Sequence, residues 1–246
     1  MSQSIKSNSS KGKKSQQQKD REKNIKEIKM YYWTKVDQGD RTEVVKILTF
    51  AKQNFNQDNE MFEIVNCTNS DGFTPLHLAS SEGHAPLIEI LIKFGAQVDA
   101  RTNNFRTPLH IACLRGNLSV IQALIQHGAD INAKDIDSNT PCHFCSEYGH
   151  RFCLKFLLTR NPYLFANNNE DKSAIDVAIS SEILNEFQEF ITKSKDLNQN
   201  KKKAGYTAQP KAVESTQQSS RMENISQQNA YNKKQAESGH NSNLGS

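Results

Sequence analysis

The chain has 246 residues, a formal net charge of +4 and 35% hydrophobic residues, which is enough for one modest folded domain and much additional polar chain. No uncharged apolar run reaches roughly 18 residues, so the sequence argues against a membrane-spanning helix. The first residues lack the apolar segment of a signal peptide, and the five cysteines follow no disulfide-framework spacing. We therefore expect a cytoplasmic protein, with the nucleus as an alternative address.

Charge and composition divide the chain into three parts. Residues 1–30 contain nine Lys/Arg against three Asp/Glu, and residues 193–246 contain nine against four. Residues 31–192 instead contain 13 Lys/Arg against 20 Asp/Glu. The two ends are rich in Ser, Gln and Asn and poor in large apolar groups, so little offsets the entropy of ordering them. This pattern predicts a disordered basic arm over 1–25, an acidic folded body over 26–192 and a disordered polar and basic tail over 193–246.

The folded body is predicted to begin with a helix, a turn and a second helix. Apolar residues return near helical spacing from Ile25 onward, and Gly39 separates them from a second apolar run that contains Val44 and Leu48. The polar stretch 54–59 then reads as an insertion, either a loop or a helix extension, before the pattern resumes near Ile64.

A strict repeat follows. The motif Thr-Pro-x-His begins at Thr74, Thr107 and Thr140, which are separated by 33 residues each time. Threonine suits a helix N-cap, and proline suits the first helical position, where its missing amide has no intrahelical partner. Gly116 and Gly128 each follow an apolar run and predict the ends of two helices within one repeat.

The period of 33, the Thr-Pro-Leu-His opening and the closing Gly-Ala-Asp-Ile-Asn-Ala resemble the ankyrin repeat. The resemblance implies an all-α solenoid with short β-hairpin turns and about five units. We expect a degenerate N-terminal cap repeat, three regular repeats and a degenerate C-terminal cap, at 26–67, 68–100, 101–133, 134–166 and 167–192. Terminal units have one neighbour only, which explains why they depart from the pattern.

The resemblance also implies a function, namely a non-catalytic interaction module that binds a partner protein in a concave groove. We expect such a protein to be monomeric by itself and to need no cofactor. Partner contacts in such repeats come from hairpin tips and outward positions of each first helix. Carried over position by position, these are Phe73, Glu82, Phe105, Arg106, Leu114, Arg115, Ile136, Asp137, Asn139, Glu147 and Tyr148. Phe73, Phe105, Arg106 and Arg115 are expected to form one patch that points away from the stacking core.

One departure from the repeat pattern concerns the hairpin tip. Gly72 of the first regular repeat is replaced by Phe105 and Ser138 in the next two. If this position requires a positive φ, a bulky side chain there carries strain. The substitution indicates either a different turn or an exposed aromatic side chain that is kept for binding.

Two further groups of residues invite a chemical role. His77, His110 and His143 recur at one repeat position, and in ankyrin repeats this histidine joins neighbouring units by hydrogen bonds. Cys142 and Cys145 form a C-x-x-C, but the two further ligands of a zinc site are not present at suitable spacing, so a zinc- or thiol-dependent protein is a weak alternative. No phosphate-binding loop or hydrolase motif occurs. The lysine-rich segments 11–14 and 201–203 leave open a nuclear regulator whose tails contact nucleic acid weakly.

Overall fold

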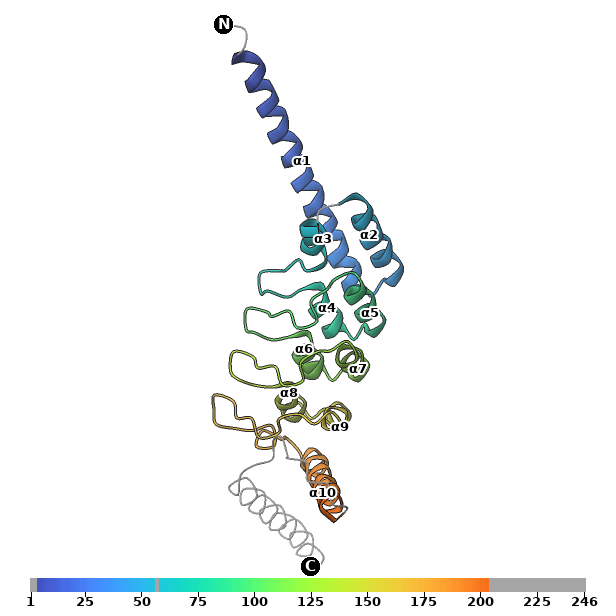
Figure 1. Cartoon of the computed structure of the whole chain (residues 1–246), viewed down its shortest axis with the longest axis vertical. Coiled ribbons are helices and arrows are strands. Elements are labelled where there is room, and N and C mark those ends of the chain that lie inside the picture. The colour runs from blue at the N-terminus through green and yellow to red at the C-terminus, as the bar shows by residue number, and fades with distance from the viewer. Residues whose placement is uncertain (1–3, 56–57, 204–246) are drawn as a thin grey trace, which may run out of the picture. The chain divides into compact units, whose positions relative to one another are not determined.

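The computed structural model describes residues 4–55 and 58–203 (Figure 1). Within these two ranges there are ten helices and no strand, so the fold is an all-α solenoid, as the sequence predicts. The helices are α1 (Ser4–Asp37), α2 (Arg41–Asn54), α3 (Asp58–Val65), α4 (Pro75–Glu82), α5 (Ala85–Lys93), α6 (Pro108–Arg115), α7 (Leu118–Gln126), α8 (Pro141–Glu147), α9 (Arg151–Leu158) and α10 (Ser181–Lys203). None of the described helices is both long enough and apolar enough to cross a membrane.

The chain divides into two compact units, Met1–Lys193 and Ser194–Ser246. All packing described below lies in the first unit.

Three helix pairs form the centre of this unit, and α6 with α7 illustrates how the sequence builds them. The Thr107 side chain caps α6 by accepting a hydrogen bond from the His110 amide, and Pro108 is the first helical residue. Gly116 ends the helix in the left-handed region with φ 74°. A Cβ at this position would lie 2.5 Å from the His150 ring, so both the backbone conformation and the close approach require glycine.

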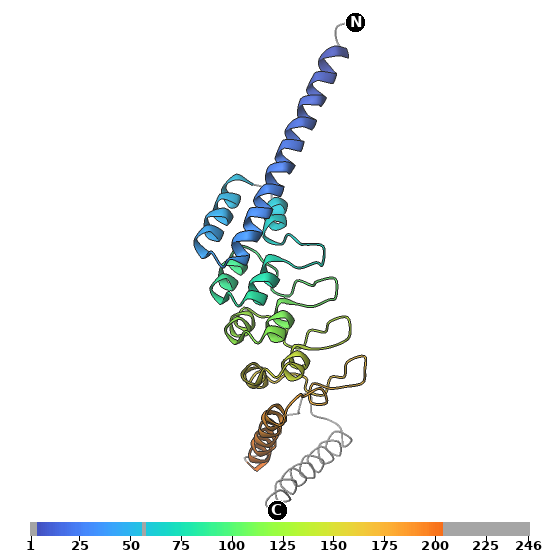
Figure 2. The same ribbon diagram turned by 180° about the vertical axis from the view of Figure 1, so that it is seen from behind.

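The pairs stack as parallel layers, with α4, α6 and α8 in one row and α5, α7 and α9 in the other. Figures 1 and 2 show the connecting turns projecting on the side of the first row, away from the second. Leu76, Leu109 and Leu124 are fully buried between layers. Because each layer buries its apolar faces on its neighbours, no pair has a core of its own.

The N-terminal end of the array is formed by α1, α2 and α3. Tyr32 and Val36 of α1 and Leu48 of α2 are fully buried, and Gly39 provides the turn between the two helices with φ 68°. The predicted insertion is divided between the end of α2 and the start of α3, and residues 56–57 lie outside the described part.

Helix α1 begins at Ser4, whereas the composition predicts a disordered arm up to residue 25. Residues 4–25 contain no proline and include six Lys and three Gln, which are compatible with continuation of the helix even without an apolar face. Likewise α10 extends to Lys203, beyond the expected limit at 192. The rest of the predicted tail, 204–246, lies outside the described residues, as do the side chains of both lysine-rich segments.

The C-terminal end departs from the repeat in its first helix. The expected helix after Ser173 is a turn, in which the Asp176 carboxylate accepts hydrogen bonds from the Ser173 amide and hydroxyl, at 2.8 and 2.6 Å. Without the proline and histidine of the other repeats, this segment makes only a single capped turn. The second helix of this last unit is the first part of α10, with Ile183 and Phe187 buried.

Candidate functional site

Four turns of the same construction form the candidate site, three of them before α4, α6 and α8 and the fourth before the capped turn at Ser173. In each, the side chain of the first residue accepts a hydrogen bond from the backbone amide four residues later. The pairs are Asn69 with Phe73 at 2.9 Å, Thr102 with Arg106 at 3.1 Å, Asp135 with Asn139 at 2.8 Å and Asn168 with Lys172 at 3.0 Å. In each turn a side-chain oxygen, rather than a backbone carbonyl, accepts this amide hydrogen bond. The four tips therefore have the same shape although their sequences differ.

The fourth position of every turn has left-handed backbone. It is occupied by Gly72 with φ 78°, Phe105 with φ 57°, Ser138 with φ 62° and Asp171 with φ 59°. Phe105 therefore occupies the same kind of turn as Gly72. This excludes a different turn as the explanation for the phenylalanine and leaves an exposed aromatic side chain kept for binding. A phenylalanine in this region is disfavoured by the contact of its Cβ with the backbone, and its ring is 47% exposed.

Neighbouring tips are joined by backbone hydrogen bonds, one for each step of the repeat. The Asn103 amide donates to Asp71 O at 3.0 Å, Ile136 to Asn104 O at 2.9 Å and Asn169 to Asp137 O at 2.9 Å. The turns therefore form a continuous surface. We name the tip surface the turns at 69–73, 102–106, 135–139 and 168–172 together with the exposed C-terminal ends of α4, α6 and α8.

The recurring histidines hold these turns against the helices. Nε2 of His77 donates to Arg106 O at 3.0 Å, and Nε2 of His110 and His143 donate to Asn139 O and Lys172 O, each at 3.1 Å. Nδ1 of each ring accepts a hydrogen bond from the amide of its own repeat's threonine at 3.1 Å. Burial lowers the pKa of His77 and of His110 to about 4, so both rings are neutral near pH 7. The predicted structural role is confirmed.

The predicted partner-binding residues are distributed over the tip surface, and most of them reach solvent. The exposed ones are Glu82, Phe105, Arg115, Ile136, Asp137, Glu147 and Tyr148, whereas Phe73, Arg106, Leu114 and Asn139 are partly buried. Ile136 is 50% exposed and Tyr148 is 51% exposed, which places two large apolar groups on the repeat that follows the one with Phe105.

The expectation that Arg106 points away from the core is wrong. Its Nε lies 3.4 Å from Oδ2 of the fully buried Asp135 carboxylate, and its guanidinium lies 5.0 Å from the centre of the buried Phe144 ring. Asn139 is also engaged, because its Oδ1 accepts a hydrogen bond from Asn168 at 2.9 Å. Both side chains join neighbouring repeats.

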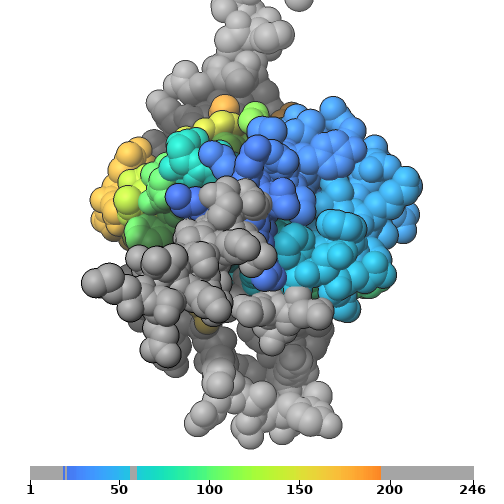
Figure 3. All heavy atoms as spheres, turned by 90° about the horizontal axis from the view of Figure 1, so that it is seen from above, coloured from blue at the N-terminus to red at the C-terminus, as the bar shows by residue number. Residues whose placement is uncertain are grey.

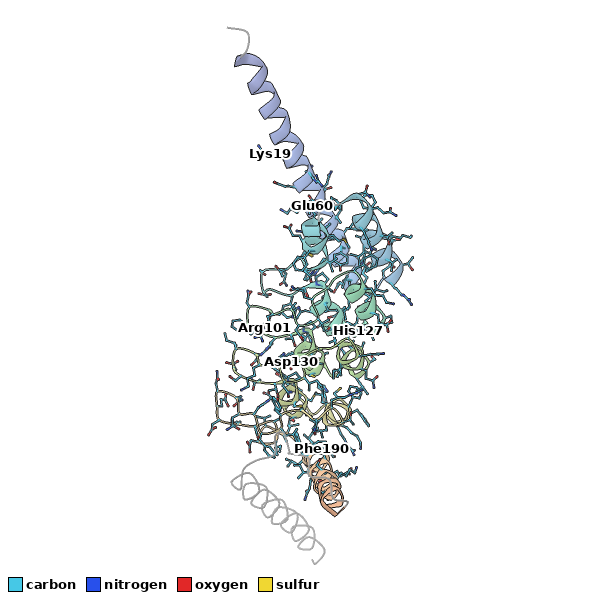
Figure 4. The ribbon with its side chains drawn as sticks, viewed as in Figure 1. Lys19, Glu60, Arg101, His127, Asp130 and Phe190 are labelled. Atoms are coloured by element: carbon cyan, nitrogen blue, oxygen red, sulfur yellow. The ribbon has the colours of Figure 1, made fainter. Side chains whose placement is uncertain are left out.

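The four residues expected to form one patch have separate partners instead. The Phe73 ring lies 5.5 Å from the His77 ring, and Nε of Arg115 lies 3.3 Å from the Ser81 hydroxyl. The guanidinium of Arg101 lies 5.8 Å from the Phe105 ring, and Figure 4 shows Arg101 on the turn side, opposite His127.

Sequence reasoning missed Arg101 and Phe144. Arg101 precedes the turn motif, although its position four residues before Phe105 was an available signal. Phe144 occupies the variable position of the Thr-Pro-x-His-x motif, where Leu78 and Ile111 stand in the other repeats. There it packs edge-on against His110 and stacks with Tyr148, at ring separations of 5.7 and 6.4 Å.

The cysteine cluster lies inside the stack. Cys113, Cys142, Cys145 and Cys153 are buried and unbonded to one another by disulfides. Burial raises the pKa of the Cys142 thiol to about 12 and also raises that of Cys145, which keeps both protonated near pH 7. Among the described residues no three His, Cys, Asp or Glu side chains are placed to hold a metal ion.

Comparison with protein families decides which repeat this is. A family model described as ankyrin repeats in three copies matches residues 34–135, and a second, described as ankyrin repeats in many copies, matches residues 116–158. Together they cover 34–158, about half of the chain. The chain belongs to the ankyrin-repeat family. Ankyrin repeats are generally protein–protein interaction modules. No curated protein matches the sequence.

Proposed function

We propose that this ankyrin-repeat protein is a non-catalytic intracellular module that binds a segment of a partner protein on its tip surface. The five free cysteines, four of them buried, support a reducing compartment such as the cytoplasm. The rigid ladder of turns supports binding without a large ordering cost, because the tips are already held by hydrogen bonds before a partner arrives.

The observation that carries this proposal is the side chain at position 105. A left-handed backbone costs a non-glycine residue about 1 to 2 kcal/mol, and the Phe105 ring recovers little by packing because it is 47% exposed. Together with Ile136 and Tyr148 of the next repeat, it gives two neighbouring repeats exposed apolar groups. Aromatic side chains of this kind dominate interface energies. Binding explains why a strained, exposed aromatic group is present.

The test replaces Phe105 by glycine. Phe105→Gly removes the ring and relieves the backbone strain, so we expect the free energy of unfolding to rise by up to about 1 kcal/mol. The same change is expected to weaken binding of the partner by about 2 kcal/mol. The measurements are urea unfolding and affinity for the partner, identified beforehand by crosslinking to the wild-type chain.

Ser138→Gly is the matched control, because Ser138 has the same left-handed backbone in the next turn but carries no ring. It removes only the hydrogen bond from the Ser138 hydroxyl to Asn169, so it is expected to reduce the affinity much less than Phe105→Gly does. If Phe105→Gly retains every partner at full affinity, the tip surface around Phe105 is not the binding site.

A further inference from the structure

A second surface lies on the pair of helices that caps the N-terminal end of the array. A groove of about 570 Å³ runs between α1 and α2, and none of its lining residues belongs to the tip surface. Figure 3 shows the side chains of these two helices beside each other at this end. We name it the cap groove; α1 contributes Asn24, Glu27, Ile28 and Tyr31, α2 contributes Lys46, Ile47 and Phe50, and Phe55 follows α2.

The cap groove is lined mainly by apolar side chains, two of which are about half exposed to solvent. Ile47 is only 9% exposed, whereas the Phe50 ring is 52% exposed and Tyr31 on the opposite helix is 48% exposed. Single exposed apolar residues are common on protein surfaces, but two aromatic rings on facing walls of one groove form a contiguous patch, which marks an interaction site.

The walls of the groove suit a helical ligand. The α1 positions 24, 27, 28 and 31 follow the i, i+3, i+4, i+7 spacing of one helix face, which extends over about two turns or roughly 10 Å. Both walls are α-helices whose backbone groups are bonded within each helix, so they offer no edge to which a strand could add. A ligand that satisfies its own backbone and presents apolar side chains at the same spacing is an amphipathic helix.

The charges at the groove indicate the sign of the charge that the ligand carries. Lys46 is paired with Glu43 at 2.8 Å, and the Tyr31 hydroxyl also approaches that carboxylate at 3.4 Å. Glu27 forms no hydrogen bond or ion pair with any other described residue, and Lys23, one turn earlier on α1, does not pair with it. The groove therefore has one uncompensated carboxylate at its edge.

We propose that the cap groove binds an amphipathic helix of a partner protein, with apolar residues between α1 and α2 and a Lys or Arg against Glu27. None of the residues of the cap groove belongs to the tip surface, so this site is independent of the function proposed above. It gives the protein two separate contact surfaces, one on the turns and one on the capping helices.

The test uses two synthetic helical peptides with the same leucine stripe at i, i+3, i+4 and i+7. One carries lysines beside the stripe and the other carries glutamates at the same positions. Fluorescence anisotropy with the full-length chain is expected to show about fivefold tighter binding of the lysine helix. Phe50→Ala is expected to weaken that binding about tenfold. Glu27→Lys is expected to reverse the preference between the two peptides.

Phe62→Ala is the matched control, because Phe62 on α3 is 47% exposed and lies outside the groove. It is expected to leave both affinities unchanged, as is Phe105→Gly, which separates this proposal from that of the tip surface. Thermal unfolding of Phe50→Ala and Glu27→Lys verifies that both variants are folded. Absence of binding by either helix, or an unchanged preference in folded Glu27→Lys, overturns the proposal. A dimer of the chain that Phe50→Ala dissociates would also overturn it, since the occupant would then be a second copy.

Discussion

Arg106 illustrates how a single side chain on the tip surface can belong to the fold and to the surface at once. Its guanidinium covers the Phe144 ring of the next repeat and reaches the Asp135 carboxylate, which is inaccessible to solvent. Asp135 in turn closes the third turn by accepting hydrogen bonds from the Asp137 and Asn139 amides. A contact of this residue with a partner would therefore be coupled to the shape of the neighbouring tip.

Arg106→Glu is expected to lower the free energy of unfolding by about 2 to 4 kcal/mol, because it places a second carboxylate against buried Asp135. Urea unfolding measures the loss. The control is Arg115→Glu, an exposed arginine whose partner is only the Ser81 hydroxyl, and there we expect a change within about 0.5 kcal/mol. Equal losses in the two variants would mean that the contact with Asp135 contributes nothing.

The histidines predict how stability depends on pH. The folded-state pKa of His77 and His110 is about 4, below the ordinary value of 6.5, because burial disfavours the charged ring. Between these values the unfolded chain binds more protons than the folded one, so stability is fully present above pH 6.5 and is lost as the pH falls toward 4. From pH 7 to pH 5 we expect each ring to account for a loss of about 2 kcal/mol.

Urea unfolding over this range tests the prediction, with His110→Gln as the comparison. Glutamine cannot become protonated, so the variant is expected to be less stable at pH 7 but to have a shallower pH dependence. A slope as steep as that of the wild type would assign the acid sensitivity to other groups.

At the scale of elements, helix α10 is attached to its neighbour through a buried charge. The Glu186 side chain is 3% exposed and accepts from Arg151 of α9 at 2.7 Å, with Lys155 at 3.3 Å from its other oxygen. These two cations hold the pKa of Glu186 below its usual value although burial acts in the opposite direction. The contact joins the last regular helix pair to the C-terminal cap, where no full first helix is present.

Glu186→Gln is expected to destabilise this end by about 1 to 2 kcal/mol, because Arg151 and Lys155 then face an uncharged amide instead of a carboxylate. In this variant, amide hydrogen exchange is expected to become faster in α10 than in the wild type, whereas exchange in α6 is expected to change less. Glu189→Gln serves as the control, since Glu189 pairs only with Lys193 at an exposed site. If exchange in α10 is the same in both variants, Glu186 does not anchor the helix.

At the scale of the whole molecule, stability is distributed over neighbouring layers. Leu109 is fully buried in α6, which packs against both α4 and α8. Leu109→Ala is expected to cost about 2 to 5 kcal/mol, as other buried leucine truncations do. In a stacked array that loss affects the layers on both sides. A shift in the denaturation midpoint worth less than about 0.5 kcal/mol would contradict the burial of this residue.

The sequence by itself determined the family, the helix pairs and the repeat register. Each of these follows from local signals that recur every 33 residues, namely the Thr-Pro opening, the histidine and the glycines that end helices. Cap and turn preferences act over one turn of chain, so they can be read without knowing what lies beside them. The exposure of Phe105, Ile136 and Tyr148 followed from the same register.

Only the tertiary structure decided where the long side chains go. Arg106 lies 29 residues from Asp135 and 38 from Phe144 along the chain, and the period alone does not show whether such a side chain extends to solvent or across to the next repeat. The cap groove was likewise not predictable, since it depends on how closely α1 approaches α2 in a unit that lacks the repeat pattern. Regular repeats specify their backbone locally, whereas side-chain contacts between layers depend on the packing of the whole stack.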